Sequence, residues 1–150
     1  AASRNRHHSA NIPNNQRTRK RPPSEEALQL SSQLKAFSTQ KRLQECLDLY
    51  WDAANDNIRD EHHACIVVDC AGRCGNIQEG ERVVEALVSN GSGETRRVNV
   101  ETQTALLKGY VHAGEMEKGV GLFRTMCQSR KTRDRPNVRS LNTFLRGCLW

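Results

Sequence analysis

Apolar residues recur at spacings of three and four along most of this chain, which is the spacing of one face of an α-helix. Two such stripes are Leu43, Cys46, Leu47 and Tyr50, and Met116, Val120 and Phe123. Alternation of apolar and polar residues with a period of two, which is typical of a half-buried strand, does not extend over a useful length. The pattern therefore predicts an all-α fold.

The helical pattern restarts at regular intervals. It begins anew at Ala27, Glu61, Val100 and Val138, so the predicted repeats span 27–60, 61–99 and 100–137, and a partial repeat spans 138–150. The extra residues of the longer repeats fall in 89–99 and 128–137, where Gly, Ser and basic residues mark loops that lengthen at little cost. One helix pair cannot bury its apolar stripe alone, so neighbouring pairs must stack. We expect an α-solenoid of stacked antiparallel helix pairs.

Glycine and proline residues mark the turns of this array. Gly75 and Gly114 lie where the first helix of a pair must end, and glycine tolerates the left-handed backbone geometry that such an end needs. Pro136 lies late in a loop and separates one repeat from the next, because proline cannot continue a helix.

The partial repeat predicts a single helix without a partner. We expect its Leu141, Phe144 and Leu145 to cover the preceding helix pair. The chain does not begin with Met and its fourth repeat stops early, so we interpret it as a piece of a longer protein.

The first 26 residues differ from the array. Residues 1–23 carry six Arg and Lys side chains and no acidic one, and Ile12 is their only large apolar residue. Such a composition cannot bury a core, so we predict a disordered basic tail at 1–26. It fits part of an organelle transit peptide, but the amphipathic face of such peptides is missing. A nucleic-acid-binding arm, a nuclear import patch and a plain linker stay open as alternatives.

Charge divides the predicted array into two halves. Residues 24–85 hold six basic and twelve acidic side chains, whereas residues 86–150 hold eleven basic and five acidic ones. The array is neutral as a whole but polarised along its axis. A polyanion would be attracted to the tail and the later repeats and repelled by the first ones. The alternative is that these charges only solvate the outer helix faces.

Six cysteines raise the question of a metal or disulfide site: Cys46, Cys65, Cys70, Cys74, Cys127 and Cys148. Zinc needs four converging ligands, usually from paired CxxC-like motifs, and the sequence has no such pair. In the repeat frame Cys46 and Cys70 align with glycines, at positions where helices approach closely. Cysteine packs there as a small apolar residue. We expect no metal and no other cofactor.

Catalytic signatures are missing from the sequence as well. The segment 72–75 lacks the glycine spacing and the Lys-Ser/Thr pair of a phosphate-binding loop. A nucleophilic pair of Cys65 and His62 has no third group to orient the base. No apolar run approaches the roughly 20 residues that span a membrane. We expect no enzyme, no small-molecule substrate and no membrane span in this chain.

Two phrases of the sequence carry a family resemblance. Residues 104–114 read TALLKGYVHAG and are followed by LFRTM at 122–126, and the restart at 136–147 reads PNVRSLNTFLRG. These phrases resemble pentatricopeptide repeats, and the resemblance covers the array from Ala27 on, most clearly over 100–147. It implies a right-handed solenoid whose first helices line a concave surface, with single-stranded RNA along that surface and one base read per repeat.

The resemblance also implies which residues read the bases, because the family uses the fifth residue of a repeat together with the last residue before the next one. Carried onto this chain, the pairs are Thr104 with Asn137, Cys65 with Asn99 and Ser31 with Asp60, and Asn142 begins a fourth pair. By the family's code the first pair favours adenine and the third favours guanine. The pair of Cys65 and Asn99 departs from the usual residue types, so its repeat should discriminate poorly.

The second residue of each repeat packs on the base in that family. Leu28, His62, Glu101 and Arg139 hold this position. The carboxylate of Glu101 would repel phosphate, so we expect His62 and Arg139 to be the polar residues that contact RNA at this position.

For function, the resemblance implies binding of single-stranded RNA in organellar RNA processing, stability or translation, in a mitochondrion or plastid, with other proteins as further partners. One alternative is a helical-repeat scaffold for proteins, including a subunit of an organellar ribosome. Another is the RNA-binding part of a nuclease whose catalytic domain lies outside this sequence.

Overall fold

The computed structural model describes residues 22–89 and 98–149, and within these ranges the chain is all-α. Most of the predicted disordered tail lies outside the described residues. The helices are α1 (Glu25–Thr39), α2 (Leu43–Trp51), α3 (Glu61–Arg73), α4 (Ile77–Ser89), α5 (Val100–Ala113), α6 (Met116–Cys127) and α7 (Val138–Cys148), with short 3-10 turns η1 (Ala53–Asn55) and η2 (Thr132–Asp134).

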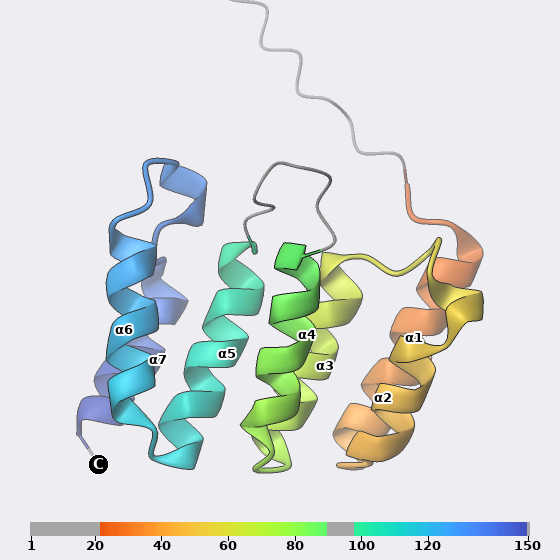
Figure 1. The fold of residues 1–150 in the computed structure, drawn as a ribbon, viewed down its shortest axis with the longest axis horizontal. Coiled ribbons are helices and arrows are strands. Elements are labelled where there is room, and N and C mark those ends of the chain that lie inside the picture. Colours follow the sequence, from red (N-terminus) through yellow and green to blue (C-terminus); the bar gives the residue numbers. More distant parts are fainter. Residues whose placement is uncertain (1–21, 90–97, 150) are drawn as a thin grey trace, which may run out of the picture.

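The helices form antiparallel pairs that stack side by side in two layers (Figure 1). The first helices of the pairs, α1, α3 and α5, pack in this order and are followed by α7. The second helices α2, α4 and α6 form the other layer, and each contacts the first helix of its own pair and of the next pair. This arrangement is the predicted α-solenoid.

A polar side chain caps the start of each first helix. Ser24, Asp60, Asn99 and Asn137 accept hydrogen bonds from backbone N–H groups in the first turns of α1, α3, α5 and α7. The cap at Ser24 places the start of α1 at Glu25, two residues before the expected start of the array at Ala27. The acidic side chains of Glu25 and Glu26 therefore belong to α1 rather than to the tail, beside the positive end of the helix dipole.

The turns within the second and third pairs have the predicted geometry. Gly75 has φ 75° and Gly114 has φ 74°, which is the left-handed region that glycine adopts without strain. These residues end α3 and α5 and let the chain reverse into α4 and α6.

The core lies between the two layers. The eighth residue of each full repeat is an aliphatic side chain without solvent exposure, namely Leu34, Val68 and Leu107. Cys46 and Cys70 are also fully buried in this apolar core, so they pack as small apolar residues. The repeat frame thus corresponds to a repeated packing position.

The last helix packs only in part as predicted, because Phe144 stacks on Phe123 of the preceding pair with the ring centroids 4.4 Å apart. Leu141 is 44% exposed and Leu145 is 48% exposed, so they do not cover the preceding pair. The buried side of α7 is instead formed by small residues, Ser140 and Gly147. A Cβ on Gly147 would lie 2.7 Å from Val111 Cγ2, so the absence of a side chain allows α7 to approach α5 closely and turns the leucines outward.

Candidate nucleic-acid interface

The first helices line a groove of about 1140 Å³. Of the residues that the sequence singles out, this groove contains Asp60, His62, Cys65, Asn99, Thr104 and Arg139. These residues come from α3, α5, α7 and the segments directly before α3 and α5. The structure therefore brings six of the nine candidate residues, from the three full repeats and the partial one, to one concave surface.

The remaining candidates lie at the ends of this groove. Ser31 lines an adjoining pocket of about 630 Å³ that it shares with Asp60 and His62. Asn142 lies with Arg139 in a third pocket of about 480 Å³ on α7. Asn137 is exposed directly before α7. The candidate residues thus follow the stacking direction of the helices.

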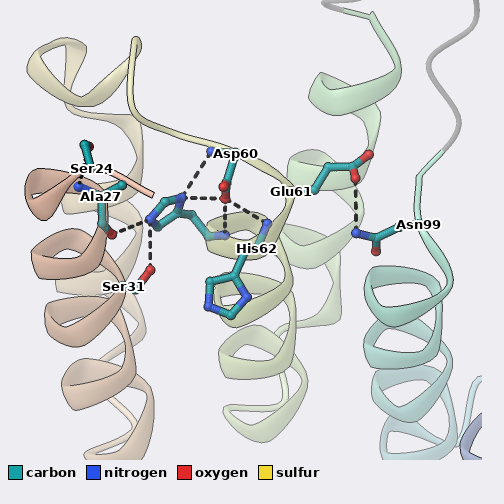
Figure 2. A network of polar contacts seen from close by, with 8 residues as sticks. Ser24, Ala27, Ser31, Asp60, Glu61, His62 and Asn99 are labelled. Carbon is teal, nitrogen blue, oxygen red and sulfur yellow. Dashed lines mark hydrogen bonds and ion pairs between the residues drawn. The ribbon is translucent and has the colours of Figure 1, made fainter. Parts of the chain in front are cut away.

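The last residue of each repeat doubles as the cap of the next first helix. Asp60 Oδ1 accepts from the amides of His62 (2.9 Å) and His63 (3.1 Å), as Figure 2 shows for the start of α3. Asn99 Oδ1 accepts from the Thr102 amide (2.9 Å), and Asn137 Oδ1 accepts from the Ser140 amide (3.0 Å). These bonds orient the side-chain amides. The other terminal atom is an acceptor oxygen in Asp60 but a donor nitrogen in Asn99 and Asn137.

The second terminal atom of Asn99 has a partner within the protein. Its Nδ2 donates to Glu61 Oε2 (3.1 Å), so the cap of α5 is joined to the first residue of α3 (Figure 2). One N–H of Asn99 therefore remains for a ligand. Asn99 is accordingly more constrained than Asn137.

The fifth residues of the repeats lie deep rather than on the rim. Ser31 is 8% exposed and Thr104 is 5% exposed. The Thr104 hydroxyl donates its proton to the Val100 carbonyl (2.6 Å), so toward a ligand it can act only as a hydrogen-bond acceptor. Cys65 is half-buried, and burial raises the pKa of its thiol, which therefore stays uncharged at neutral pH. Asn142 in α7 is exposed.

The second residues of the repeats project from the helix starts. Leu28, His62, Glu101 and Arg139 are all exposed. Leu28, at 55% exposure, is an apolar surface beside the pocket that contains Ser31. Exposed side chains at this position are free to lie against a bound ring.

The groove has no excess of positive charge. Its basic side chains are Lys35, Arg73, Lys108 and Arg139, and its acidic ones are Asp60, Glu61, Asp69 and Glu101. At the centre, Asp69 forms ion pairs with Arg73 (2.7 Å) on its own helix and with Lys108 (3.0 Å) on α5. Two of the four cations thus share one carboxylate partner.

Two features of the site were not predicted from the sequence. The capping role of the last residues has a sequence signal, since Asp or Asn before a helical stripe is typical of an N-cap. The double ion pair of Asp69 had no such signal, because Lys108 lies 39 positions away and approaches only through the packing of α5 on α3.

The described part of the chain offers neither a metal site nor a membrane-spanning helix. Within it, no group of three or more His, Cys, Asp or Glu residues is arranged to hold a metal ion. Over the same ranges, no helix combines the length and the apolar character that crossing a membrane requires.

Comparison with known proteins agrees with the repeat geometry. Residues 104–130 match the family model of the pentatricopeptide repeat. A segment of 82 residues, 55% of this chain, is 29% identical to a pentatricopeptide repeat-containing protein of Arabidopsis thaliana. The aligned part covers 11% of that protein, so the chain spans only a small fraction of the relative's length. The repeat match, the relative and the all-α repeat fold together support assignment of the chain to the pentatricopeptide repeat family.

Proposed function

We propose that this chain binds single-stranded RNA along the groove of its first helices and reads one base per repeat. The observation that carries the proposal is the regular placement of two polar residues at each helix start. In successive repeats a capping Asp or Asn and a short fifth side chain line one continuous surface.

The depth of the fifth residues favours unpaired bases. Ser31 and Thr104 are almost fully buried at the floor of their pockets, so only the edge of a base that enters the groove reaches them. In an A-form duplex the Watson–Crick edges are paired and the groove that displays base edges is shallow. Single-stranded RNA leaves these edges free.

Donor and acceptor positions support a preference in the third repeat. Asn137 directs its Nδ2 donor away from the helix, and Thr104 offers an acceptor lone pair. Adenine presents an acceptor at N1 beside a donor amino group at N6, so the two side chains complement its edge. We infer that this repeat prefers adenine.

The first and second repeats differ from the third. Asp60 directs a carboxylate oxygen outward, and this acceptor suits the N–H donors of guanine. In the second repeat Cys65 presents a thiol, which is a weak donor and acceptor, and Asn99 is partly tied to Glu61. We infer guanine preference in the first repeat and poor discrimination in the second.

The balanced charge of the groove implies modest affinity. Phosphate contacts supply most of the sequence-independent affinity for nucleic acids, and half of the groove cations already have a carboxylate partner. We propose that this chain is an RNA-binding module and not an enzyme, and that it acts in organellar RNA processing, stability or translation, in a mitochondrion or plastid. The family resemblance supports the organellar role.

Fluorescence anisotropy with oligonucleotides of equal length tests the proposal. Single-stranded RNA should bind more tightly than the matching duplex, and oligoadenylate more tightly than oligouridylate. The double variant Thr104→Asn, Asn137→Asp should shift preference toward uracil, because the outward atom at position 137 becomes an acceptor for the uracil N3–H group. Equal affinity for single and double strands, or no binding of either, would refute RNA reading by this groove.

A further inference from the structure

One buried side chain joins the two base-reading residues of the first repeat. His63, on α3, is 1% exposed. Its Nε2 lies 3.0 Å from Ser31 Oγ and 2.9 Å from the Ala27 carbonyl oxygen on α1. Its Nδ1 lies 3.1 Å from the Asp60 amide nitrogen and 2.7 Å from Asp60 Oδ1. Ser31 and Asp60, which belong to separate elements, are thus connected through one imidazole (Figure 2).

The third repeat has the same connection with a different residue type. Ser140, on α7, has no solvent exposure. Its hydroxyl lies 2.7 Å from Thr104 Oγ1 and 3.1 Å from Asn137 Oδ1, while its amide donates to the same Asn137 oxygen (3.0 Å). His63 and Ser140 are both the third residue of their repeat, counted from Glu61 and Val138. The same three-residue link therefore occurs twice.

The link fixes which atoms face the groove. A carbonyl only accepts, so His63 Nε2 carries a proton toward Ala27, and the neighbouring Ser31 oxygen lies beside this proton as an acceptor. The hydroxyl proton of Ser31 is then left for a base. In the third repeat the Thr104 proton is directed to the Val100 carbonyl, so Thr104 accepts the hydroxyl proton of Ser140, and the Ser140 amide is the group that donates to Asn137 Oδ1. The two fifth residues have similar chemistry but present opposite hydrogen-bond character.

The second repeat shows the link broken. Thr102 occupies the third position of α5, and its amide donates to Asn99 Oδ1 (2.9 Å) as in the other repeats. Its hydroxyl is buried and makes no hydrogen bond of ordinary geometry within the described residues. The Cys65 thiol contacts it only weakly, and this contact opposes the burial that raises the pKa of the thiol. A thiol in place of a hydroxyl at position 65 thus leaves a buried polar atom without such a bond, which is unusual in folded proteins.

We propose that the third residue of each following repeat, His63 and Ser140 here, is a positioning residue that sets base selectivity by holding the fifth and last residues together. This inference rests on the proposed RNA binding. In this proposal His63 and Ser140 influence selectivity without contacting RNA. The second repeat should discriminate poorly between bases because the Thr102 hydroxyl does not hold Cys65 and Asn99 together.

Removal of one link tests the proposal. The probes are oligouridylate and the same oligonucleotide with one central adenosine, and the readout is the ratio of the two dissociation constants for the full chain. Ser140→Ala should reduce this ratio about fivefold, the factor for one lost hydrogen bond, with unchanged affinity for plain oligouridylate. Thr102→Val is the matched control, because its hydroxyl makes no hydrogen bond of ordinary geometry to a reading residue, and it should leave the ratio unchanged.

Restoring the missing link provides a gain-of-function test. Cys65→Ser offers the Thr102 hydroxyl a partner, so the second repeat should gain a preference for adenosine. Oligouridylate with two adjacent central adenosines should then bind this variant about fivefold more tightly than oligouridylate with one. The same substitution combined with Thr102→Val should lose this gain, since the new serine then has no partner behind it. Thermal unfolding of each variant checks that the fold is retained.

The outcomes separate this inference from the proposed function. Adenosine preference in the unaltered chain that persists in Ser140→Ala would overturn the inference and leave RNA reading intact. A gain in Cys65→Ser that survives Thr102→Val would overturn it too, because the fifth residue would then act alone. Failure of the unaltered chain to bind RNA at all would overturn the proposed function and the inference with it.

Discussion

At the scale of single residues, the last position of each repeat caps a helix with the same side chain that we propose reads a base. Asp60, Asn99 and Asn137 use Oδ1 to cap a helix, and this holds the second terminal atom in a fixed place. A change from Asn to Asp therefore replaces a donor by an acceptor without moving the side chain. Caps of this kind stabilise a helix by about 1 kcal/mol, so a substitution that changes the proposed base preference at these positions should also be checked for its effect on stability.

Asp69 should restrain RNA binding. Its carboxylate holds Arg73 and Lys108 in the centre of the groove, where phosphate would compete for the same cations. Asp69→Asn should strengthen RNA binding at low salt by about three- to tenfold, because removing one carboxylate frees two cations. Titration of labelled oligoadenylate measures the change. Glu117→Gln is the control, since it removes the same charge from an exposed site on α6; equal gains in both variants would mean that net charge alone matters.

At the scale of elements, the sequence predicted the pairing of helices and the places where they reverse. Gly75 and Gly114 have the expected left-handed geometry, and the eighth residues of the full repeats are buried. The predicted buried face of α7 was right for Phe144, which stacks on Phe123, and wrong for Leu141 and Leu145, because the close approach at Gly147 buries the side of the helix that carries small residues. The candidate reading residues were placed by resemblance, but their depth and their links through His63 and Ser140 depend on contacts between residues more than 30 positions apart.

The crossing of α3 and α5 depends on a glycine. A Cβ on Gly109 would lie 2.1 Å from Ile77 Cδ1 and 3.5 Å from the Gly72 Cα atom. Ile77 is buried at 1% exposure, so it must change rotamer within a packed core. Gly109→Ala should therefore lower the free energy of unfolding by about 1–3 kcal/mol, even though alanine favours the helix by about 1 kcal/mol.

A second glycine provides the matched control for this crossing. A Cβ on Gly121, in the middle of α6, would meet no atom within 4 Å. Gly121→Ala should raise the free energy of unfolding by about 0.5–1 kcal/mol through helix propensity alone. Urea denaturation followed by circular dichroism measures both variants. If both variants were destabilised to a similar extent, the effect of Gly109→Ala could not be attributed to the close approach of α3 and α5.

At the scale of the whole molecule, the groove crosses from an acidic half of the chain into a basic half. Lys35 and Arg139 line it at opposite ends, and neither forms an ion pair within the described ranges. Lys35 belongs to the half with twice as many acidic as basic residues. Arg139 lies beside Arg146 in the pocket on α7. Phosphate groups should therefore concentrate at the α7 end of the groove.

This polarity predicts unequal effects of two matched substitutions. Arg139→Gln should weaken binding of single-stranded RNA clearly more than Lys35→Gln, although each removes one exposed cation from the same groove. Loss of one phosphate contact lowers the slope of log affinity against log salt by about 0.7 for a single strand, so the slope should fall for Arg139→Gln and stay nearly constant for Lys35→Gln. Binding isotherms over a series of salt concentrations give both slopes. Equal slopes in the two variants would mean that RNA follows the groove without regard to the charge of its two ends, and the affinity would then have to come from the bases rather than from the phosphates.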